Sequence, residues 1–346
     1  MIRWGVVGAC GIADRRTIPE GIMPAENAEL TAVMDVAEDR LEAVAKKYEA
    51  RSYTSSADLY KDPDVDAVYI AIPTFQHCKE ALRAAEAGKH VLCEKPMAMT
   101  VSEARQMIEA CRRAKVKLGF GYMMRFHPLH VKLKGMVKAG QLGKLVMGRA
   151  QLTCWYPPID GAWRQDADKG GGGSFVDMGT HCIDVLEMFM GKVDKVSAFT
   201  SRLVQAYPVE DTAVVSVMFR SGAVGVVDNH FNVPDEAVLN VLELYGSKGS
   251  VMAEGTIGQM STGKMIARLQ GETKGYAAAQ QRSAVQAAEV FGDPRNIYQA
   301  EIEEFCKAIE EDRQPPVPGE DGLWNLKIAV AAYQSVRTGK VVAVEE

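Results

Sequence analysis

A lysine directly follows a short apolar run in this sequence, where its ammonium group could take part in proton transfer. Residues 90–92 form the apolar run, and residues 93–96 read Cys-Glu-Lys-Pro. The run predicts a buried strand, and open α/β sheets bind ligands in the crevice at the carboxyl ends of their strands. Pro96 restricts Lys95 to an extended backbone and makes a cis peptide affordable at that bond. A buried Lys95 could relay a proton or stabilise an oxyanion; a surface lysine before a turn proline is the ordinary alternative.

A second group of residues suited to acid–base chemistry follows a run of four glycines at 170–173. Asp177, His181 and Asp184 are spaced by four and three residues, so a helix there would project them from one side. A histidine beside a carboxylate is suited to removing a proton near neutral pH. The glycines allow a tight backbone path next to a ligand, or form a flexible surface loop. A capped helix start with a satisfied histidine is the ordinary alternative for this segment.

The N-terminal residues have the pattern of a strand, a glycine turn and a helix. Gly8 permits the turn, and the backbone amides that follow it at a helix N-terminus form an anion site suited to a pyrophosphate. The usual G-x-G-x-x-G/A spacing would put its second glycine at position 10, where this chain has Cys10, with Gly11 and Ala13 after it. The pattern predicts a dinucleotide site with a departure at the second glycine, and a plain glycine turn is the alternative.

An acidic residue ends the second predicted strand, over residues 29–34. Asp35 could accept hydrogen bonds from both ribose hydroxyls of NAD and would repel the extra phosphate of NADP. It could instead cap the helix predicted from about residue 37. Arg40, one turn into that helix, leaves room for NADP. We therefore expect NAD as the cofactor, with NADP possible.

The bulk composition is that of an ordinary globular protein. The chain has 346 residues, 47% of them hydrophobic and 25% charged, and a net charge of −5. This length allows two domains, and the mild acidity gives no reason to propose nucleic acid or an anionic membrane as a partner. No apolar stretch approaches a membrane span, and the chain starts directly in a strand rather than a signal peptide. Seven cysteines with no CxxC pair fit a reducing cytoplasm, and we expect no metal site.

The order of the predicted elements indicates two kinds of sheet. Up to about residue 122, apolar strands alternate with amphipathic helices, as in a parallel sheet covered on both faces. After about residue 145, strand-like segments such as 212–219, 223–233 and 237–245 follow one another with short turns, which is typical of an antiparallel sheet. The fold class is therefore α/β followed by α+β. Residues 264–292 are the hardest to place, and we interpret them as a mobile loop or arm.

Individual elements follow from periodicity and end signals. Thr100 and Glu103 have the spacing of a capping box. Strands are predicted at about 66–72, 90–94 and 117–122. Helices are predicted at about 37–48, 76–87, 100–114, 297–311 and 322–338.

Taken together, the motifs resemble the family of glucose–fructose oxidoreductase and inositol 2-dehydrogenase, often called Gfo/Idh/MocA, over essentially the whole length. The matching segments are the glycine turn, residues 71–74 with His77, residues 87–96, Gly121-Tyr122 with Arg125-Phe126, Trp163-Arg164, and the glycine run leading to Asp177 and His181. Within the family, Gly8-Ala9-Cys10, Trp163-Arg164 and residues 319–324 look closest to the branch of 1,5-anhydrofructose reductase and sugar dehydrogenases. That branch also lacks the middle glycine, but Asp35 departs from its NADP-binding pattern and favours NAD(H).

The resemblance implies a dinucleotide-binding Rossmann domain at 1–124 and a substrate-binding and oligomerisation α+β domain at 125–346. The second domain's open, mainly antiparallel sheet would make a homodimer or homotetramer, and helix 322–338 could pack back near the first domain. The active site would lie between the domains, with Lys95, Asp177 and His181 as the catalytic set. His181 would act as general base, Lys95 would hydrogen-bond the reacting oxygen, and Asp177 would orient the substrate.

The resemblance also implies binding residues beyond this set. The cofactor-binding residues would be Gly8, Ala9, Cys10, Gly11, Ile12, Asp35, Arg40, Pro73, Thr74, His77, Glu94, Lys95, Trp163 and Arg164. The substrate-binding residues would be Lys95, Tyr122, Arg125, Tyr156, Trp163, Asp177 and His181. His127 and Asp184 are further substrate candidates. A helix-start histidine is the alternative for His77, and core packing or an ion pair is the alternative for Tyr122, Arg125, His127, Tyr156 and Asp184.

We therefore expect an NAD(P)-dependent oxidoreductase that acts on a cyclic polyol, monosaccharide or glycoside. One alternative is a redox-neutral glycosidase that keeps NAD bound and oxidises sugar C3 transiently. Another is a non-catalytic sensor that binds a dinucleotide and a partner protein, although the intact Lys95, Asp177 and His181 argue against it.

Overall fold

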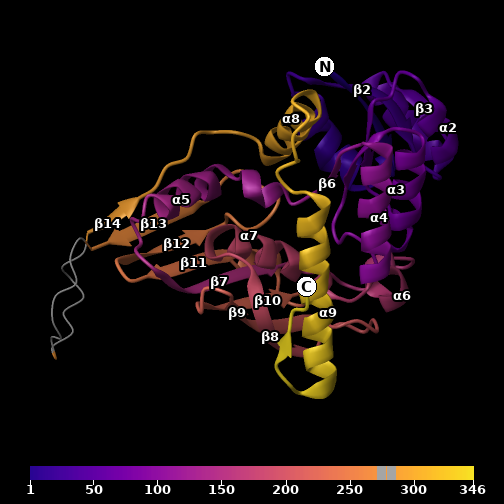
Figure 1. The fold of residues 1–346 in the computed structure, drawn as a ribbon. Coiled ribbons are helices and arrows are strands. Elements are labelled where there is room, and N and C mark those ends of the chain that lie inside the picture. Colours follow the sequence, from indigo (N-terminus) through magenta and orange to yellow (C-terminus); the bar gives the residue numbers. More distant parts are fainter. Residues whose placement is uncertain (271–277, 279–285) are drawn as a thin grey trace. The chain divides into compact units, whose positions relative to one another are not determined.

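The computed structural model of the chain describes residues 1–270, 278 and 286–346. The chain forms two compact units (Figure 1). The first consists of residues 1–123, 161–171 and 296–327, and the second of residues 124–160, 172–295 and 328–346. The units are interleaved along the chain, since residues 161–171 and 296–327 pack with residues 1–123. The single domain boundary at 124/125 stays a prediction.

The first unit is built on a six-stranded parallel sheet in the order β3-β2-β1-β4-β5-β6. The apolar runs form central strands that are buried on both faces, which confirms the predicted Rossmann sheet. Because the sheet is parallel, the loops after all its strands leave from one edge. The strands are β1 (Ile2–Val7), β2 (Ala28–Met34), β3 (Arg51–Tyr53), β4 (Ala67–Ile70), β5 (His90–Cys93) and β6 (Leu118–Phe120).

Helices cover both faces of this sheet. One apolar cluster joins the sheet to η1, α1 and α8, and the other joins it to α2, α3 and α4, which lie on the opposite face. Figure 1 shows α3 and α4 side by side. The predicted capping box is present, since Glu103 N donates to Thr100 Oγ1 at 3.2 Å and Thr100 N donates to Glu103 Oε2 at 3.1 Å. The helices are η1 (Ala9–Ile22), α1 (Glu38–Tyr48), α2 (Ser56–Lys61), η2 (Thr74–Gln76), α3 (His77–Glu86), α4 (Val101–Ala114), η4 (Trp163–Gln165), α6 (Ala167–Gly170) and α8 (Ile297–Glu310).

The helix α8 comes from far along the chain and packs on the first strand and its helix. Phe305 packs at a tilt against the fully buried Trp4, with ring centroids 5.6 Å apart, and Trp4 Nε1 donates to Cys306 Sγ at 3.4 Å. A Cβ added at Gly21 of η1 would be 3.2 Å from the carbonyl oxygen of Tyr298. The long helix α9 (Gly319–Thr338) contributes its residues up to 327 to this unit and the rest to the other.

Within the described residues, the second unit is built on an open nine-stranded sheet in the order β14-β13-β12-β11-β7-β10-β9-β8-β15. Its pairs are antiparallel except for β10 with β7, which confirms a mainly antiparallel sheet. The strands are β7 (Leu145–Thr153), β8 (Val193–Ser201), β9 (Thr212–Phe219), β10 (Val224–His230), β11 (Val241–Gly246), β12 (Gly249–Glu254), β13 (Lys264–Leu269), β14 (Ala287–Glu289) and β15 (Val342–Ala343).

One face of this sheet carries the helix that contains His181. Figure 1 shows α7 (Thr180–Met190) along the sheet, where it packs on β7 and β10. Gly148 of β7 permits this close approach, because an added Cβ would lie 2.5 Å from Met190 Sδ. The remaining helices of the unit are η3 (Met123–Phe126, which begins at the last residue of the first unit), α5 (Pro128–Lys138), η5 (Phe175–Gly179) and η6 (Asp235–Ala237).

The interpretation of residues 264–292 as a mobile loop or arm was wrong for their ends. Residues 264–269 form β13 and residues 287–289 form β14, which pair with each other and, through β13, with β12. Met265 and Ala267 are buried at alternate positions of β13, which is the period of a half-buried strand. Residues 271–277 and 279–285 lie outside the described residues.

A half-buried carboxylate, that of Glu210, holds the segment that leads into α7. Glu210 accepts hydrogen bonds from Gly173 N at 3.0 Å, from Phe175 N at 3.1 Å and from the Tyr333 hydroxyl at 2.8 Å. A Cβ at Gly172 would lie 2.0 Å from the Tyr333 hydroxyl, and one at Gly173 would lie 2.1 Å from the Glu210 carbonyl oxygen. The predicted tight backbone path is therefore present, and the backbone at Gly172 and Gly173 packs against Tyr333 and Glu210.

We expect Glu210→Ala to loosen this segment, because it leaves buried backbone donors without their acceptor. The loss should be about 2–4 kcal/mol in the free energy of unfolding. Hydrogen exchange at residues 172–180 should become faster than in the wild type. Glu254→Ala, which removes an exposed carboxylate of β12 in the same unit, is the control and should leave that exchange unchanged. Equal protection in the two variants would contradict the role given to Glu210.

Candidate active site

The turn after β1 requires its first glycine. Gly8 has φ +88°, and an added Cβ would lie 2.5 Å from the carbonyl oxygen of Ala71. After Gly8 the chain enters η1 but leaves helical geometry once, at Gly11 (φ −110°, ψ −126°). Among the described residues, apart from Gly11 and its two chain neighbours, no heavy atom lies within 4 Å of a Cβ added at Gly11. The turn therefore has open space at Gly11, just before the helix continues from Ile12.

Asp35, at the end of β2, holds this turn. Its Oδ2 accepts a hydrogen bond from Cys10 N at 2.9 Å, and its Oδ1 accepts one from Ala37 N at 3.0 Å. The helix α1 starts at Glu38, and Ala37 provides no side-chain cap for it. Asp35 therefore acts as a cap only through its hydrogen bond from the Ala37 amide, just before the helix. Arg40 Nη1 donates to the Cys10 carbonyl oxygen at 3.4 Å. Burial and the nearby Asp35 carboxylate raise the pKa of the Cys10 thiol to about 11.

The residues after β4 lie at the same edge of the sheet. Thr74 is 1% exposed, and its buried hydroxyl has no hydrogen-bond partner within the part of the chain that the structure describes. His77, at the start of α3, lies between two carbonyl oxygens, with Nδ1 2.9 Å from Pro96 O and Nε2 2.8 Å from Ile72 O. Burial lowers the pKa of His77. The histidine thus links the loops after β4 and β5, and Pro73 and Thr74 border it.

The loop after β5 carries Lys95. The Lys95–Pro96 peptide bond is cis. Glu94 Oε2 accepts a hydrogen bond from Lys95 N at 3.2 Å, and Glu94 Oε1 accepts one from the hydroxyl of Tyr69. Burial raises the pKa of Glu94, and the Tyr69 hydrogen bond and the charges of Lys95 and Arg164 oppose that rise. Lys95 is half-buried at the carboxyl end of a central strand.

Trp163 and Arg164 belong to the first unit rather than to the second half of the chain. The Arg164 guanidinium lies over the Trp163 ring, 4.2 Å from its centroid. The charge of Arg164 acts on His77 and Glu94, and α6 contacts η2, the turn that contains Thr74. The structure therefore places Trp163 and Arg164 at the sheet edge that carries the other cofactor-binding candidates of this unit. These are the turn at Gly8 and the residues Thr74, His77, Glu94 and Lys95.

In the second unit, one continuous helix carries Asp177, His181 and Asp184. A π-helical turn over residues 175–179 runs into α7, so the predicted helix is confirmed. His181 is 6% exposed and Asp177 is half-buried. Asp184 is 2% exposed and accepts hydrogen bonds from Arg125 at 2.5–3.0 Å. For Arg125 and Asp184 the structure thus shows an ion pair between a half-buried guanidinium and a buried carboxylate, and contact of either with substrate stays a prediction.

The other substrate candidates have structural partners. Tyr122 is 1% exposed and belongs to the apolar core of the first unit. His127 caps α5, accepting from Leu129 N at 3.2 Å through Nδ1 and donating to Thr262 O at 3.2 Å through Nε2. The half-buried Tyr156 packs on Phe231, with ring centroids 4.9 Å apart. Tyr122 packs in the core and Tyr156 packs on Phe231, and contact of either with substrate stays a prediction.

Sequence reasoning missed the groups that support these side chains. They are Tyr69, which bonds Glu94, and Glu210 with Tyr333, which hold the segment before Asp177. A tyrosine within the apolar run 67–72 is a signal that could have been used, because a buried hydroxyl needs a partner. Glu210 and Tyr333 are 123 residues apart, and neither stands in a motif.

The residues of the first unit fit a bound dinucleotide. The glycine turn has open space at Gly11, the first amides of the helix after it have no intrahelical acceptor, and Asp35 lies at the end of the neighbouring strand. The buried Thr74 hydroxyl is a polar group that the described residues leave without a partner. Within those residues no group of His, Cys, Asp and Glu could hold a metal ion, and no helix is long and apolar enough to cross a membrane.

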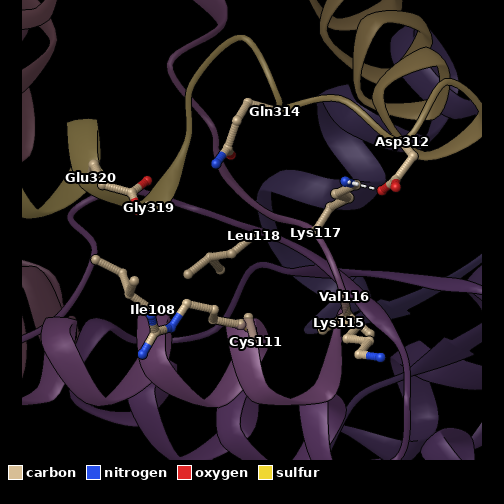
Figure 2. Close-up of a pocket in the computed structure, with 11 residues that line it drawn as sticks. Ile108, Cys111, Lys115, Val116, Lys117, Leu118, Asp312, Gln314, Gly319 and Glu320 are labelled. Atoms are coloured by element: carbon tan, nitrogen blue, oxygen red, sulfur yellow. Dashed lines mark hydrogen bonds and ion pairs between the residues drawn. The ribbon is translucent and has the colours of Figure 1, made fainter.

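A separate pocket of about 440 Å³ lies away from these residues (Figure 2). It is lined by the carboxyl end of α4, by β6 and by residues 312–320, and it contains the Lys117–Asp312 ion pair, with 2.6 Å between Nζ and Oδ1. None of the predicted site residues lines it. The pocket therefore adds nothing to the candidate active site.

Comparison with known proteins identifies both halves of the chain. Residues 2–122 match the oxidoreductase family with an NAD-binding Rossmann fold, and residues 130–252 match the GFO/IDH/MocA C-terminal domain. A 1,5-anhydro-D-fructose reductase from Ensifer adhaerens is 31% identical, covering 100% of this chain and 99% of that protein. A myo-inositol 2-dehydrogenase from Thermotoga maritima is 32% identical and covers 98% of each chain.

Among solved structures, an aldose–aldose oxidoreductase from Caulobacter crescentus complexed with glycerol has a TM-score of 0.88. It is 27% identical in sequence and covers 99% of each chain. With an NAD-binding Rossmann domain and two relatives of near-complete coverage, the chain belongs to the Gfo/Idh/MocA family of oxidoreductases.

Proposed function

We propose that this chain is an NAD-dependent oxidoreductase that interconverts a secondary alcohol and a ketone, or an aldose and its lactone, on a sugar, cyclic polyol or glycoside. The observation that carries the proposal is the position of Lys95. It is half-buried at the carboxyl end of β5, next to the carboxylate of Glu94, at the sheet edge that also carries the turn of Gly8. The names of the relatives, a sugar reductase and a polyol dehydrogenase, support the substrate class.

The assigned roles follow from the chemistry of the side chains. A bound NAD⁺ would supply the acceptor for the hydride that leaves the substrate carbon. His181 takes the hydroxyl proton, since a neutral imidazole is a base near neutral pH. Lys95 donates a hydrogen bond to the same oxygen, which stabilises the negative charge that develops as the proton leaves. Asp177 accepts a hydrogen bond from a neighbouring hydroxyl and orients the sugar ring. In reduction the same groups return the proton.

The cofactor would be held by the groups at the edge of the parallel sheet. The amides after Gly8 would bind the pyrophosphate, Asp35 the adenine ribose, and Thr74, His77 and Glu94 would border the nicotinamide. Trp163 and Arg164 would cover that side. Arg40 is exposed and could pair with the phosphate of NADP, so the preference for NAD depends on Asp35.

We expect Lys95→Ala to lower kcat by about 10²–10⁴-fold, because a positioned proton-transfer and hydrogen-bonding group is lost. Purified protein is mixed with NAD⁺ or NADP⁺ and a panel of cyclic polyols, aldoses and glycosides, and the absorbance of the reduced nicotinamide is followed. Lys79→Ala, an exposed lysine of α3, is the control and should retain wild-type turnover.

Two other outcomes of this assay would change the assignment. Cleavage of a glycoside without net reduction of NAD⁺ would indicate the redox-neutral glycosidase. Tight dinucleotide binding without either reaction would indicate the sensor. Wild-type kcat in Lys95→Ala would remove Lys95 from the catalytic set.

We expect Asp35→Ser to move the cofactor preference toward NADP. The substitution removes the carboxylate that repels the 2′-phosphate and that accepts the ribose hydroxyls. The ratio of kcat/KM for NAD⁺ to that for NADP⁺ should fall by about 30-fold or more, since each of the two effects contributes roughly 1–2 kcal/mol. Asp35→Asn keeps an acceptor for Cys10 N and separates the loss of charge from the loss of the turn contact. An unchanged ratio in both variants would exclude this role for Asp35.

The proposed location is the cytoplasm, where the seven free cysteines stay reduced. The proposed assembly is a homodimer or homotetramer formed through the sheet face opposite α7. That face exposes Phe199, Val214, Val224 and Met252. Burial alone would raise the pKa of Asp228 on the same face, but hydrogen bonds from His230, Arg149 and Gln151 outweigh it and lower the pKa to about 2.

We expect Val224→Lys to reduce the molecular mass in solution to that of one 37.7-kDa chain, because it places a charge in the apolar contact. Val131→Lys makes the same change on the exposed surface of α5 and should leave the oligomer intact. Light scattering coupled to size exclusion measures both. A wild-type protein that elutes as a monomer would contradict the assembly.

A further inference from the structure

A line of three hydrogen bonds runs from the helix of the glycine turn to the backbone of Lys95. Thr17 Oγ1 in η1 donates to the Tyr69 hydroxyl at 2.9 Å, and the Tyr69 hydroxyl donates to Glu94 Oε1. Glu94 Oε2 then accepts the amide of Lys95 at 3.2 Å. Thr17 and Tyr69 are both 0% exposed. The predicted pyrophosphate turn and the predicted catalytic lysine therefore share one hydrogen-bonded support.

The direction of these bonds is set by the groups themselves. A hydroxyl of Tyr69 that accepts from Thr17 has its own proton available for the carboxylate, and a carboxylate can only accept while it is ionised. The pKa of Tyr69 lies well above its usual value because of burial and of the charges of Glu94 and Glu301, so this proton stays on the phenol. Tyr69 is thus a fixed donor toward Glu94.

Opposing effects act on the charge of Glu94. Burial favours its neutral form, whereas the Tyr69 hydroxyl, the Lys95 amide and the positive charges of Lys95 and Arg164 favour its ionised form. Glu301 and Tyr298 of α8 face the same region, since Glu94 acts on the pKa of Tyr298 and Glu301 on that of Tyr69. Burial is the largest of these effects and leaves the pKa of Glu94 above its usual value, and the hydrogen bond from the Tyr69 hydroxyl is the largest effect that opposes this rise.

The space around Glu94 also fixes its position. A Cβ added at Gly121, at the end of β6, would lie 3.2 Å from the Glu94 carboxyl carbon, so the carboxylate packs against the Gly121 backbone. With one side closed by Gly121 and Oε1 held by Tyr69, Oε2 is directed to Lys95 N. Loss of the phenol hydroxyl would free the carboxyl group to rotate or to become neutral.

We propose that Tyr69, supported by Thr17, is a positioning residue that keeps the Glu94 carboxylate ionised and oriented beside Lys95 and the oxidised nicotinamide. The inference rests on the proposed function, in which Glu94 borders the nicotinamide. A carboxylate there attracts the positively charged ring of NAD⁺ but not the neutral ring of NADH. Tyr69 therefore favours binding of the oxidised cofactor without contacting it.

The test compares two tyrosines with the same chemistry in different places. Tyr60 is 3% exposed in the same unit and donates its hydroxyl to Glu80 Oε2 at 3.1 Å, in a pair that involves none of the candidate site residues. Tyr69→Phe and Tyr60→Phe each remove one hydroxyl from a buried tyrosine–glutamate pair and leave the ring. The dissociation constants of NAD⁺ and NADH are measured for both variants by fluorescence titration, together with kcat.

The proposal predicts that Tyr69→Phe raises the dissociation constant of NAD⁺ about fivefold and leaves that of NADH within twofold. It also predicts that kcat falls about tenfold, because Lys95 loses its fixed neighbour. Thr17→Val should change both quantities in the same direction by a smaller factor. Tyr60→Phe should leave the dissociation constants and kcat within twofold of the wild type.

Equal effects of Tyr69→Phe on NAD⁺ and NADH, or effects no larger than those of Tyr60→Phe, would overturn the proposal. The binding measurement does not depend on turnover. A wild-type protein that binds both dinucleotides but oxidises no sugar would therefore contradict the proposed function, while the ratio of the two dissociation constants would still decide the role of Tyr69.

Discussion

Backbone amides in the loops that carry the candidate residues donate to carboxylates. Asp35 accepts the amide of Cys10 in the dinucleotide turn, and Glu94 accepts the amide of Lys95. Glu210 accepts the amides that precede Asp177. Burial raises the pKa of Glu94 and Glu210, and hydrogen bonds from tyrosine hydroxyls oppose that rise in both. The loops keep their shape as long as these carboxylates are satisfied, because a buried amide without an acceptor is costly.

The sequence was sufficient for the local structure around these loops. Apolar runs in the first 122 residues predicted the parallel strands, and the capping box at Thr100 predicted the start of α4; both are confirmed. Gly8 was expected at a turn, and its positive φ and its contact with Ala71 explain why no other residue fits. These features depend on residues close together in sequence or on the hydrophobic periodicity of a single helix or strand, and both are visible in the sequence.

What the sequence did not reveal depends on contacts between distant residues. Tyr333 reaches Glu210 across 123 positions, and α8 packs on Trp4 from the other end of the chain. Residues 264–269 have few end signals, and their strand exists because β12 offers an edge to pair with. The four glycines suggested a tight backbone path next to a ligand or a flexible loop, and they did not reveal that Gly172 and Gly173 lie against Tyr333 and Glu210. Such partners are set by tertiary packing rather than by local pattern.

In the proposed reaction, hydride leaves a carbon of a sugar or polyol for the cofactor held by the first unit. The most direct measurement uses a cyclic polyol or aldose with deuterium on its carbons, together with unlabelled NAD⁺, and determines the mass of the NADH formed. The account predicts NADH heavier by about one mass unit, with slower turnover than for the unlabelled substrate. Unlabelled NADH, or no NADH from any member of the substrate panel, would contradict it.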